Sequence, residues 1–319
     1  MRWVDPDRRD FLHAVALTVT AAALGCRKRD EGPVVGFSQM DNQGSWRIAE
    51  TNSLRSEARA RGYHLIVTDA QDQTAKQVGD VEDLIARRVR GLFVAPREVE
   101  GLEPAFEAAR RAGVPVFLID REAAGVPGED YVAFLGSDFV EQGRRCAAWL
   151  AAKLGGQGNL VELTGSPGSS VAADRARGFA EGIAPHPGLR IVATQTAHFA
   201  RATGQRVMEN LVQGLAGQVQ AVYAHNDEMA LGAIQALRSA GMRPGQDVIL
   251  ASIDGSRAGL EAIVRGELGV SVESNPRFGP LAFDMLERHL AGELVPPRVI
   301  LEDRLFDASN AAAFVEEAY

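Results

Sequence analysis

The chain alternates short apolar runs with amphipathic stretches about nine times between Val34 and Leu301. Each run is rich in Val, Ile, Leu and Phe, and the stretch that follows it places apolar residues at helical spacing. Runs of this kind predict strands that are buried on both faces, as in a parallel sheet covered by helices. The predicted strands begin at Val34, His64, Gly91, Val114, Asn159, Arg190, Ala221, Val248 and Gly269.

The order of these elements divides the chain into two doubly wound units. Strands and helices alternate up to a strand at Tyr131–Leu135, which completes the first unit. A second set begins with a helix near Val140–Leu154 and is interrupted at Ser274–Pro276. The pattern then predicts a helix over Phe278–Leu290 and a strand at Arg298–Leu301. We therefore predict an α/β protein with two lobes, each built on a doubly wound parallel sheet.

The first residues of the chain predict export. The pair Arg8–Arg9 precedes an uncharged stretch, Phe11–Gly25, which is shorter than the about twenty residues that a membrane-spanning helix needs. The arginine pair is typical of a twin-arginine signal, and a general secretory signal is the alternative. Residues 1–26 end in a lipobox-like segment, so we expect a lipidated Cys26 followed by a charged tether, residues 27–33. An unmodified cysteine in a discarded signal is the alternative.

The overall charge argues against nucleic acid as a partner, because the net charge is −8 and no segment is dense in Lys and Arg. Cys146 lies in an apolar helical stretch and is predicted to be a buried thiol without a disulfide. The six histidines lack metal-binding spacing, and no Gly-x-Ser-x-Gly motif occurs. The segment Thr164–Ser170 lacks the Gly-Lys-Ser/Thr ending of a phosphate-binding loop. We therefore expect no metal, no cofactor and no nucleophilic catalysis.

Polar residues stand where many of the predicted strands end. In open parallel sheets, ligands bind outside the carboxyl ends of the strands, where the strand order reverses. Carboxylate, amide and guanidinium groups suit a sugar there, because its hydroxyls both donate and accept hydrogen bonds. The candidates at strand ends are Ser38, Gln39, Asp120, Arg121, Asn226, Asp227, Asp254 and Glu273.

The helix after the first strand adds Trp46, Arg47 and Glu50, with Ser45 as the predicted helix cap. The alternative for this segment is an ordinary first turn with an Arg–Glu pair. Asp120 and Arg121 have their own alternative, a turn residue beside a solvated arginine. An arginine next to a cleft carboxylate nevertheless suits polyol recognition.

The second unit repeats this arrangement. Arg175 lies near the start of a helix, and its charged neighbours leave a solvent-exposed helix face as the alternative. Phe199 is a candidate stacking platform, with core packing as an equal alternative. Asn226 and Asp227 have turn and capping roles as alternatives, and the lone His225 is predicted to be structural.

Several segments resemble one protein family in a fixed order: VGFSQ followed by SWRIAET, FLIDR, SVAADRARGFAEGI, VYAHNDEMALGAIQAL, PGQDVILASIDG and SVE. They span Val34 to about Asn310. On these segments the chain resembles the type I periplasmic sugar-binding proteins of ABC importers. Within that family it is most similar to the ribose-binding group and its galactofuranose-binding members.

The resemblance implies a three-stranded hinge with crossings near Gly136, Ser274 and Glu302. It places residues 34–136 and 275–302 in one lobe, and residues 137–274 and 303–319 in the other. The two lobes would close over one sugar and remove it from water, which strengthens charged hydrogen bonds. The residues that the resemblance implies for the cleft are Trp46, Arg47, Glu50, Asp120, Arg121, Ser170, Arg175, Phe199, Asn226, Asp227, Asp254 and Glu273.

We therefore expect an exported, lipid-anchored monomer that binds a furanose or similar monosaccharide and delivers it to an ABC permease and ATPase complex. Its only membrane contact would be the lipid anchor. A first alternative keeps the binding and presents the closed form to a sensor kinase or chemoreceptor. A second is a sugar-acting enzyme that uses Asp120 and Asp254 as an acid and base pair, which requires that their pKa values differ.

Overall fold

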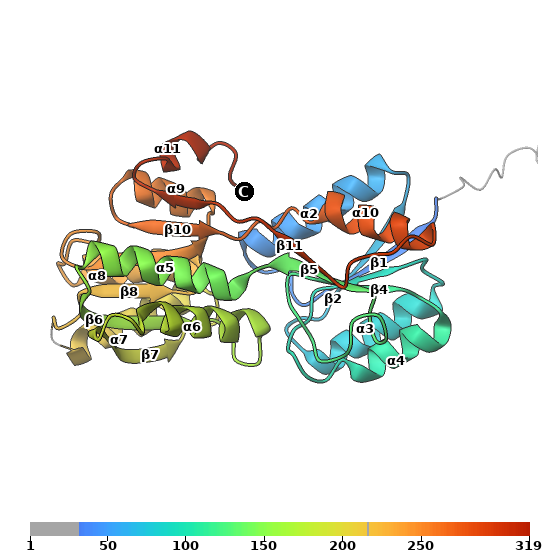
Figure 1. Ribbon diagram of the computed structural model, residues 1–319, viewed down its shortest axis with the longest axis horizontal. Helices are drawn as coiled ribbons and strands as arrows, with labels where there is room; N and C mark the ends of the chain where they lie inside the picture. Colours follow the sequence, from blue (N-terminus) through green and yellow to red (C-terminus); the bar gives the residue numbers. More distant parts are fainter. Residues whose placement is uncertain (1–31, 216) are drawn as a thin grey trace, which may run out of the picture.

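The computed structural model describes residues 32–215 and 217–319. The predicted signal with Cys26, and the tether up to residue 31, lie outside the described residues. The described chain forms two α/β lobes that lie side by side along the long axis of the molecule (Figure 1). Both lobes are built on a six-stranded sheet, as the alternating pattern predicts.

The first lobe has the strand order β11-β5-β4-β3-β1-β2, and every pair in it is parallel. Helices α2 and α10 pack together on one face of this sheet, and α3 and α4 pack together on the other (Figure 1). Its strands are β1 (Val34–Gln39), β2 (His64–Asp69), β3 (Leu92–Val94), β4 (Val116–Ile119), β5 (Ala133–Ser137) and β11 (Arg298–Leu301). Its helices are α2 (Gly44–Ala60), α3 (Thr74–Ala86), α4 (Glu103–Ala112) and α10 (Gly279–Leu290).

The second lobe repeats the topology with the order β12-β10-β9-β8-β6-β7. Helices α5 and α6 pack on one face of the sheet, and α7, α8 and α9 pack on the other. Its strands are β6 (Gln157–Thr164), β7 (Gly188–Thr196), β8 (Ala221–Ala224), β9 (Ile249–Asp254), β10 (Val270–Glu273) and β12 (Leu305–Asp307). Its helices are α5 (Phe139–Lys153), α6 (Ser170–Ile183), α7 (Arg201–Leu215), α8 (Asp227–Ser239), α9 (Arg257–Val264) and α11 (Ala311–Phe314).

Central strands feed two separate cores, because their apolar side chains alternate between the faces of the sheet. In β8, Val222 and Ala224 face the core under α7, α8 and α9, whereas Ala221 and Tyr223 face α5 and α6. The Tyr223 ring stacks on Phe179 of α6 with ring centroids 3.9 Å apart. Burial on both faces explains why these strands read as continuous apolar runs.

The structure corrects two details of the predicted sheets. The prediction that every strand is buried on both faces is wrong for β2 and β7, which lie at sheet edges and have largely half-buried or exposed residues. An edge strand lacks a neighbour on one side, so helices cover it less completely. The all-parallel prediction is also wrong at β12, which pairs antiparallel with β10 and was not predicted as a strand.

Three segments pass between the lobes (Figure 1). The first connects β5 to α5 beyond Ser137, and the second connects β10 to α10 through Ser274. The third, residues 302–304, connects β11 of the first sheet to β12 of the second. The chain ends beside these segments, between the lobes (Figure 1). Among the described residues, no helix is both long enough and apolar enough to cross a bilayer.

Candidate functional site

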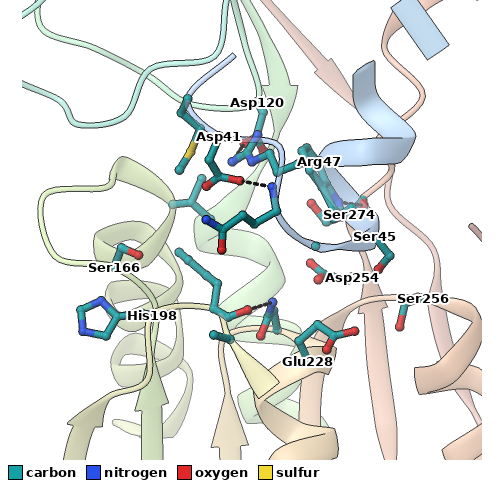
Figure 2. A pocket seen from close by; sticks show the side chains of 18 of the residues that line it. Asp41, Ser45, Arg47, Asp120, Ser166, His198, Glu228, Asp254, Ser256 and Ser274 are labelled. Carbon is teal, nitrogen blue, oxygen red and sulfur yellow. Dashed lines mark hydrogen bonds and ion pairs between the residues drawn. The ribbon is translucent and has the colours of Figure 1, made fainter. Parts of the chain in front are cut away.

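A cavity of about 540 Å³ lies between the two lobes and is lined by both. This volume falls in the range of small-molecule sites, about 300 to 1,000 Å³. Arg47 and Asp120 of the first lobe face Ser166, Glu228 and Asp254 of the second across the cavity (Figure 2). The wall is built from residues at or just beyond the carboxyl ends of strands, where such sheets bind ligands.

The first lobe contributes an arginine–carboxylate pair. Arg47 lies in the first turns of α2, which follows β1, and its Nη2 is 2.7 Å from Asp120 Oδ2. Its Nη1 is 3.0 Å from Glu50 Oε2, one turn further along the helix. Asp120 directly follows β4 and has a φ of 65°, which is unfavourable for a residue with a Cβ. Backbone strain of this kind costs about 1–3 kcal/mol and clusters at ligand sites.

The second lobe contributes an equivalent pair. Arg175 lies in α6, which follows β6, and its Nη2 is 3.6 Å from Asp254 Oδ1. Its Nη1 donates to the carbonyl of His225 at 2.5 Å. Asp254 ends β9 and also has a positive φ, of 129°. Burial raises the pKa of the Asp254 carboxyl well above its usual range, although the Arg175 charge opposes this shift.

The two pairs occupy matching places in the repeated topology. In each lobe the arginine comes from the helix after the first strand, and the aspartate from the end of the fourth. The arginines are Arg47 after β1 and Arg175 after β6, and the aspartates follow or end β4 and β9. The site is therefore pseudo-symmetric, with one buried Arg–Asp pair facing the cavity from each side.

Arg121 adds a third buried guanidinium. Its pKa is lowered to about 9 by burial first and by the neighbouring Arg47 charge second. Its Nε has no hydrogen-bond partner among the described residues, and its guanidinium carbon lies 5.6 Å from the centre of the Phe199 ring in the other lobe. A buried, incompletely paired cation is poised to donate to a ligand.

Aromatic side chains from three parts of the chain line the cavity: Trp46, Phe199 and Tyr319. The indole Nε1 of Trp46 donates to the Ser274 carbonyl at 2.8 Å. The Phe199 ring lies against Gly165, where an added Cβ would come within 1.9 Å of the ring. Only glycine therefore allows this ring to pack so closely at the end of β6.

The lobes touch each other beside the cavity. The turn after β6 reaches the first lobe, where the Val99 amide donates to the Gly168 carbonyl at 2.9 Å. The Glu122 amide donates to Ser170 Oγ at the same distance, 2.9 Å. These contacts join the two lobes directly beside the cavity.

The structure brings eight of the fourteen predicted ligand residues together on the cavity wall. They are Trp46, Arg47, Asp120, Arg121, Arg175, Phe199, Asn226 and Asp254. Asn226 also caps α8, because its Oδ1 accepts from the Met229 amide at 3.0 Å. The neighbouring Arg177 pairs with Asp174 on the exposed side of α6.

The other six predicted residues, Ser38, Gln39, Glu50, Ser170, Asp227 and Glu273, are not on the cavity wall. Ser38 and Gln39 are completely buried in β1, and Gln39 Nε2 donates to Glu50 Oε2 at 2.8 Å. Glu50 is itself fully buried, and it forms an ion pair with Arg47 on the side away from the cavity. Ser170 serves the contact between the lobes described above.

Asp227 and Glu273 also lie off the cavity wall. Asp227 is completely buried and accepts hydrogen bonds from three serine hydroxyls, those of Ser252, Ser256 and Ser271. Glu273 pairs with Arg304 at 2.7 Å and does not line the cavity. At the start of α8 it is the next residue, Glu228, that lines the wall (Figure 2). Glu228 pairs with Arg201 at 2.8 Å.

Sequence reasoning missed several wall residues. Asp41, Gln43 and Ser45 lie in the loop and first turn after β1, and their position beyond a strand end was the available signal. The predicted cap, Ser45, instead lies inside the helix, whose cap position is Gln43. The other missed wall residues are Met40, Gly44, Asp72, Ser166, Val171, His198, Ala200, Arg201, Ala202, Glu228, Ser256, Ser274 and Tyr319, and several of them also follow strand ends.

The described part of the chain contains no group of three or more His, Cys, Asp or Glu side chains that could hold a metal ion. The wall instead offers four arginines and five carboxylates: Arg47, Arg121, Arg175 and Arg201 with Asp41, Asp72, Asp120, Glu228 and Asp254. This near balance of charge favours a neutral, polyhydroxylated ligand over an anion.

Comparison with known proteins agrees with this geometry. Residues 35–294 match the family model described as a periplasmic binding protein domain. The chain belongs to this family. A galactofuranose-binding protein of Escherichia coli, YtfQ, is 38% identical over 89% of this chain and 91% of its own length. The ribose import binding protein RbsB of Bacillus subtilis is 38% identical over 82% of this chain and 83% of its own.

A solved structure supports the same assignment. The crystal structure of a galactofuranose-binding protein superposes with a TM-score of 0.87 at 36% identity, over 90% of this chain and 98% of that one. The family consists of solute-binding proteins, and its description as a periplasmic binding protein domain implies export. The two-lobed α/β prediction is confirmed.

Because Asp227 and Asp254 have different environments, we expect their substitution to change the free energy of unfolding by different amounts. Asp227→Ala leaves three buried serine hydroxyls without their acceptor, so the free energy of unfolding should fall by about 4 kcal/mol. Asp254→Ala removes an ion-pair partner 3.6 Å from Arg175 but leaves that arginine hydrogen-bonded to the His225 carbonyl, so the loss of stability should be smaller, about 1 kcal/mol. Urea unfolding of the ligand-free protein measures both, and equal losses would contradict the assignment.

The buried Glu50 carboxyl should make the stability of the protein depend on pH. Burial raises its pKa from 4.5 to about 7, and its Oε1 has no hydrogen-bond partner in the described structure. The unfolded chain loses this proton near its ordinary pKa, so stability should fall by roughly 3 kcal/mol as the pH rises from about 4.5 to 7. Glu50→Gln keeps one oxygen as a hydrogen-bond acceptor but cannot titrate, so it should flatten this part of the stability profile. An unchanged profile in the variant would rule out Glu50 as the titrating group.

Proposed function

We propose that this periplasmic binding protein captures a neutral monosaccharide, preferably in a furanose form, in the cavity between its lobes. The pseudo-symmetric Arg–Asp pairs carry this proposal, because they present donors and acceptors from opposite sides of one cavity. Sugar hydroxyls can satisfy both groups at once. The relatives named above for galactofuranose support the furanose preference.

Binding by these groups explains the chemistry of the wall. Asp120 and Asp254 accept from ring hydroxyls, while Arg47, Arg121 and Arg175 donate to oxygen atoms of the same sugar. The aromatic rings cover the apolar C–H face of the sugar. Enclosure between two lobes removes the ligand from water, and these charged hydrogen bonds strengthen in the lower dielectric.

The protein acts as the binding component of an ABC importer and does not transform its ligand. The carboxylates that an acid and base pair would need, Asp120 and Asp254, each lie beside an arginine. Such pairing suits hydrogen bonding to hydroxyls. Product analysis by NMR after prolonged incubation with the bound sugar should show the sugar unchanged.

Export and anchoring complete the proposal. The Arg8–Arg9 signal directs the protein out of the cytoplasm, and lipidated Cys26 ties the monomer to the membrane surface. The apolar segment before Cys26 and the lipobox-like residues support this part. Mass spectrometry of the mature protein from the membrane fraction should find residues 1–25 removed and Cys26 acylated.

Calorimetric titration tests the central claim. The mature protein is titrated with a panel of pentoses and hexoses, including galactose and arabinose in mixtures that contain the furanose forms. We expect saturable binding of at least one sugar at a stoichiometry of one, together with a rise in melting temperature. An absence of binding across the panel would contradict the proposal.

Arg121→Ala tests the site itself. Its guanidinium is buried and incompletely paired, so the ligand-free melting temperature should be nearly unchanged. The lost charged hydrogen bonds should weaken sugar binding about 100-fold. Arg177→Ala, on the exposed side of α6, is the matched control and should leave affinity unchanged. A large loss of stability in Arg121→Ala would show that this arginine is structural.

A further inference from the structure

A buried glutamine, Gln142, connects the ligand-facing Arg175 to all three segments that pass between the lobes. Gln142 lies in α5, one turn after the first crossing, and is 1% exposed. Its Oε1 accepts from Arg175 Nε at 3.0 Å. Its Nε2 donates to the Glu273 carbonyl at 3.1 Å and to Asp303 Oδ2 at 2.8 Å.

These partners belong to different crossings. Glu273 ends β10 at the second crossing, and Asp303 lies in the third. Ser137 ends β5 at the first crossing, and its hydroxyl donates to Asp303 Oδ1 at 3.0 Å. The carboxylate of Asp303 therefore joins the first and third crossings, and the Gln142 amide adds the second.

The chemistry of the partners fixes the orientation of the Gln142 amide. A guanidinium only donates, so the amide oxygen must face Arg175. A carbonyl and a carboxylate only accept, so the amide nitrogen must face Glu273 and Asp303. Burial raises the pKa of Asp303 to about 6, which leaves it an acceptor at neutral pH. An amide meets these demands, whereas a carboxylate or an alkyl group in its place cannot.

Close packing of α5 against α6 brings Gln142 within reach. A Cβ added at Gly143 would lie 2.4 Å from the Arg175 carbonyl oxygen, so only glycine permits this approach. With Nε held by Gln142 and Nη1 held by the His225 carbonyl, Arg175 turns its Nη2 toward Asp254 and the cavity. The guanidinium is thus fixed at two of its three nitrogens.

We propose that Gln142 is a positioning residue. It orients the Arg175 guanidinium toward the cavity, and it couples that orientation to the arrangement of the three segments that form the hinge. Gln142 does not line the cavity itself. When the lobes move, the crossings move with respect to each other, and the acceptors of the Gln142 amide move with them. The orientation of Arg175, and with it the affinity for ligand, then depends on the hinge.

The inference rests on the proposed sugar binding where affinity is the readout, so a first measurement needs no ligand. In the 15N–1H NMR spectrum of the free protein, the Arg175 Nε–H signal is identified by its loss in Arg175→Lys. In Gln142→Met, which keeps side-chain length but makes no hydrogen bond, that proton should exchange with water at least about tenfold faster because its acceptor is gone. Unchanged exchange would overturn the positioning role, whatever the ligand.

The second measurement is a double-mutant cycle on the dissociation constant of the sugar found by calorimetry. Gln142→Met should weaken binding about 10- to 100-fold in the native background and less than about twofold in Arg175→Lys. A purely structural role would give the same factor in both backgrounds and would overturn the inference. Glu141→Gln, a neighbouring exposed position on α5, is the matched control. If Gln142→Met fails to fold, Gln142→Leu enters the same cycle.

The hinge is tested with Asp303→Ala. This change should weaken binding in the native background and have no further effect in Gln142→Met, because both act through Arg175. Independent losses would show that Asp303 affects binding by another route and would overturn the link to the hinge. If the native protein binds no sugar of the panel, the proposed function fails, whereas the exchange measurement still decides the role of Gln142.

Discussion

The structure depends on how three buried guanidinium groups are held out of water between two lobes. Burial of an ion is expensive, and a nearby opposite charge offsets the cost only with good geometry. Arg47 and Arg175 meet this condition through Asp120 and Asp254, and through Glu50 and the His225 carbonyl. Arg121 meets it less completely, and the lowered pKa of its side chain reflects that imbalance. The proposed ligand, which is rich in hydroxyls, would offer Arg121 the acceptors that it lacks.

Doubling of one topology gives the site its form. Each lobe places an arginine after its first strand and an aspartate at the end of its fourth, and both aspartates have a positive φ. In a parallel sheet the carboxyl ends of the strands lie on the same side, and the segments that pass between the lobes bring these two sides to face each other. The hydrogen bonds of Gln142 then connect the crossings to one of the two arginines. The cavity wall and the segments that pass between the lobes are therefore joined by direct hydrogen bonds.

Much of this arrangement could be predicted from the sequence. The apolar runs located the strands, because burial on both faces leaves a continuous signal in the sequence. Position at a strand end also identified Asp120, Arg121, Asn226 and Asp254, which all line the cavity. Prediction failed at the edge strands and at β12, where the local composition does not reveal how many neighbours a strand has. At the start of α8 the sequence prediction named Asp227, whereas the structure places Glu228 on the cavity wall and buries Asp227.

The sequence by itself determined the two-lobed α/β architecture and the edge of each sheet that carries the polar groups. These features follow from hydrophobic periodicity, which is a local property. Only the tertiary structure decided which of two adjacent acids lines the cavity, and that Tyr319 reaches a cavity built mainly from residues far away in the chain. Side-chain direction at a strand-to-helix junction depends on the packing of neighbouring elements. In the same way, the meeting of Ser137, Gln142, Glu273 and Asp303 exists only once both lobes are assembled.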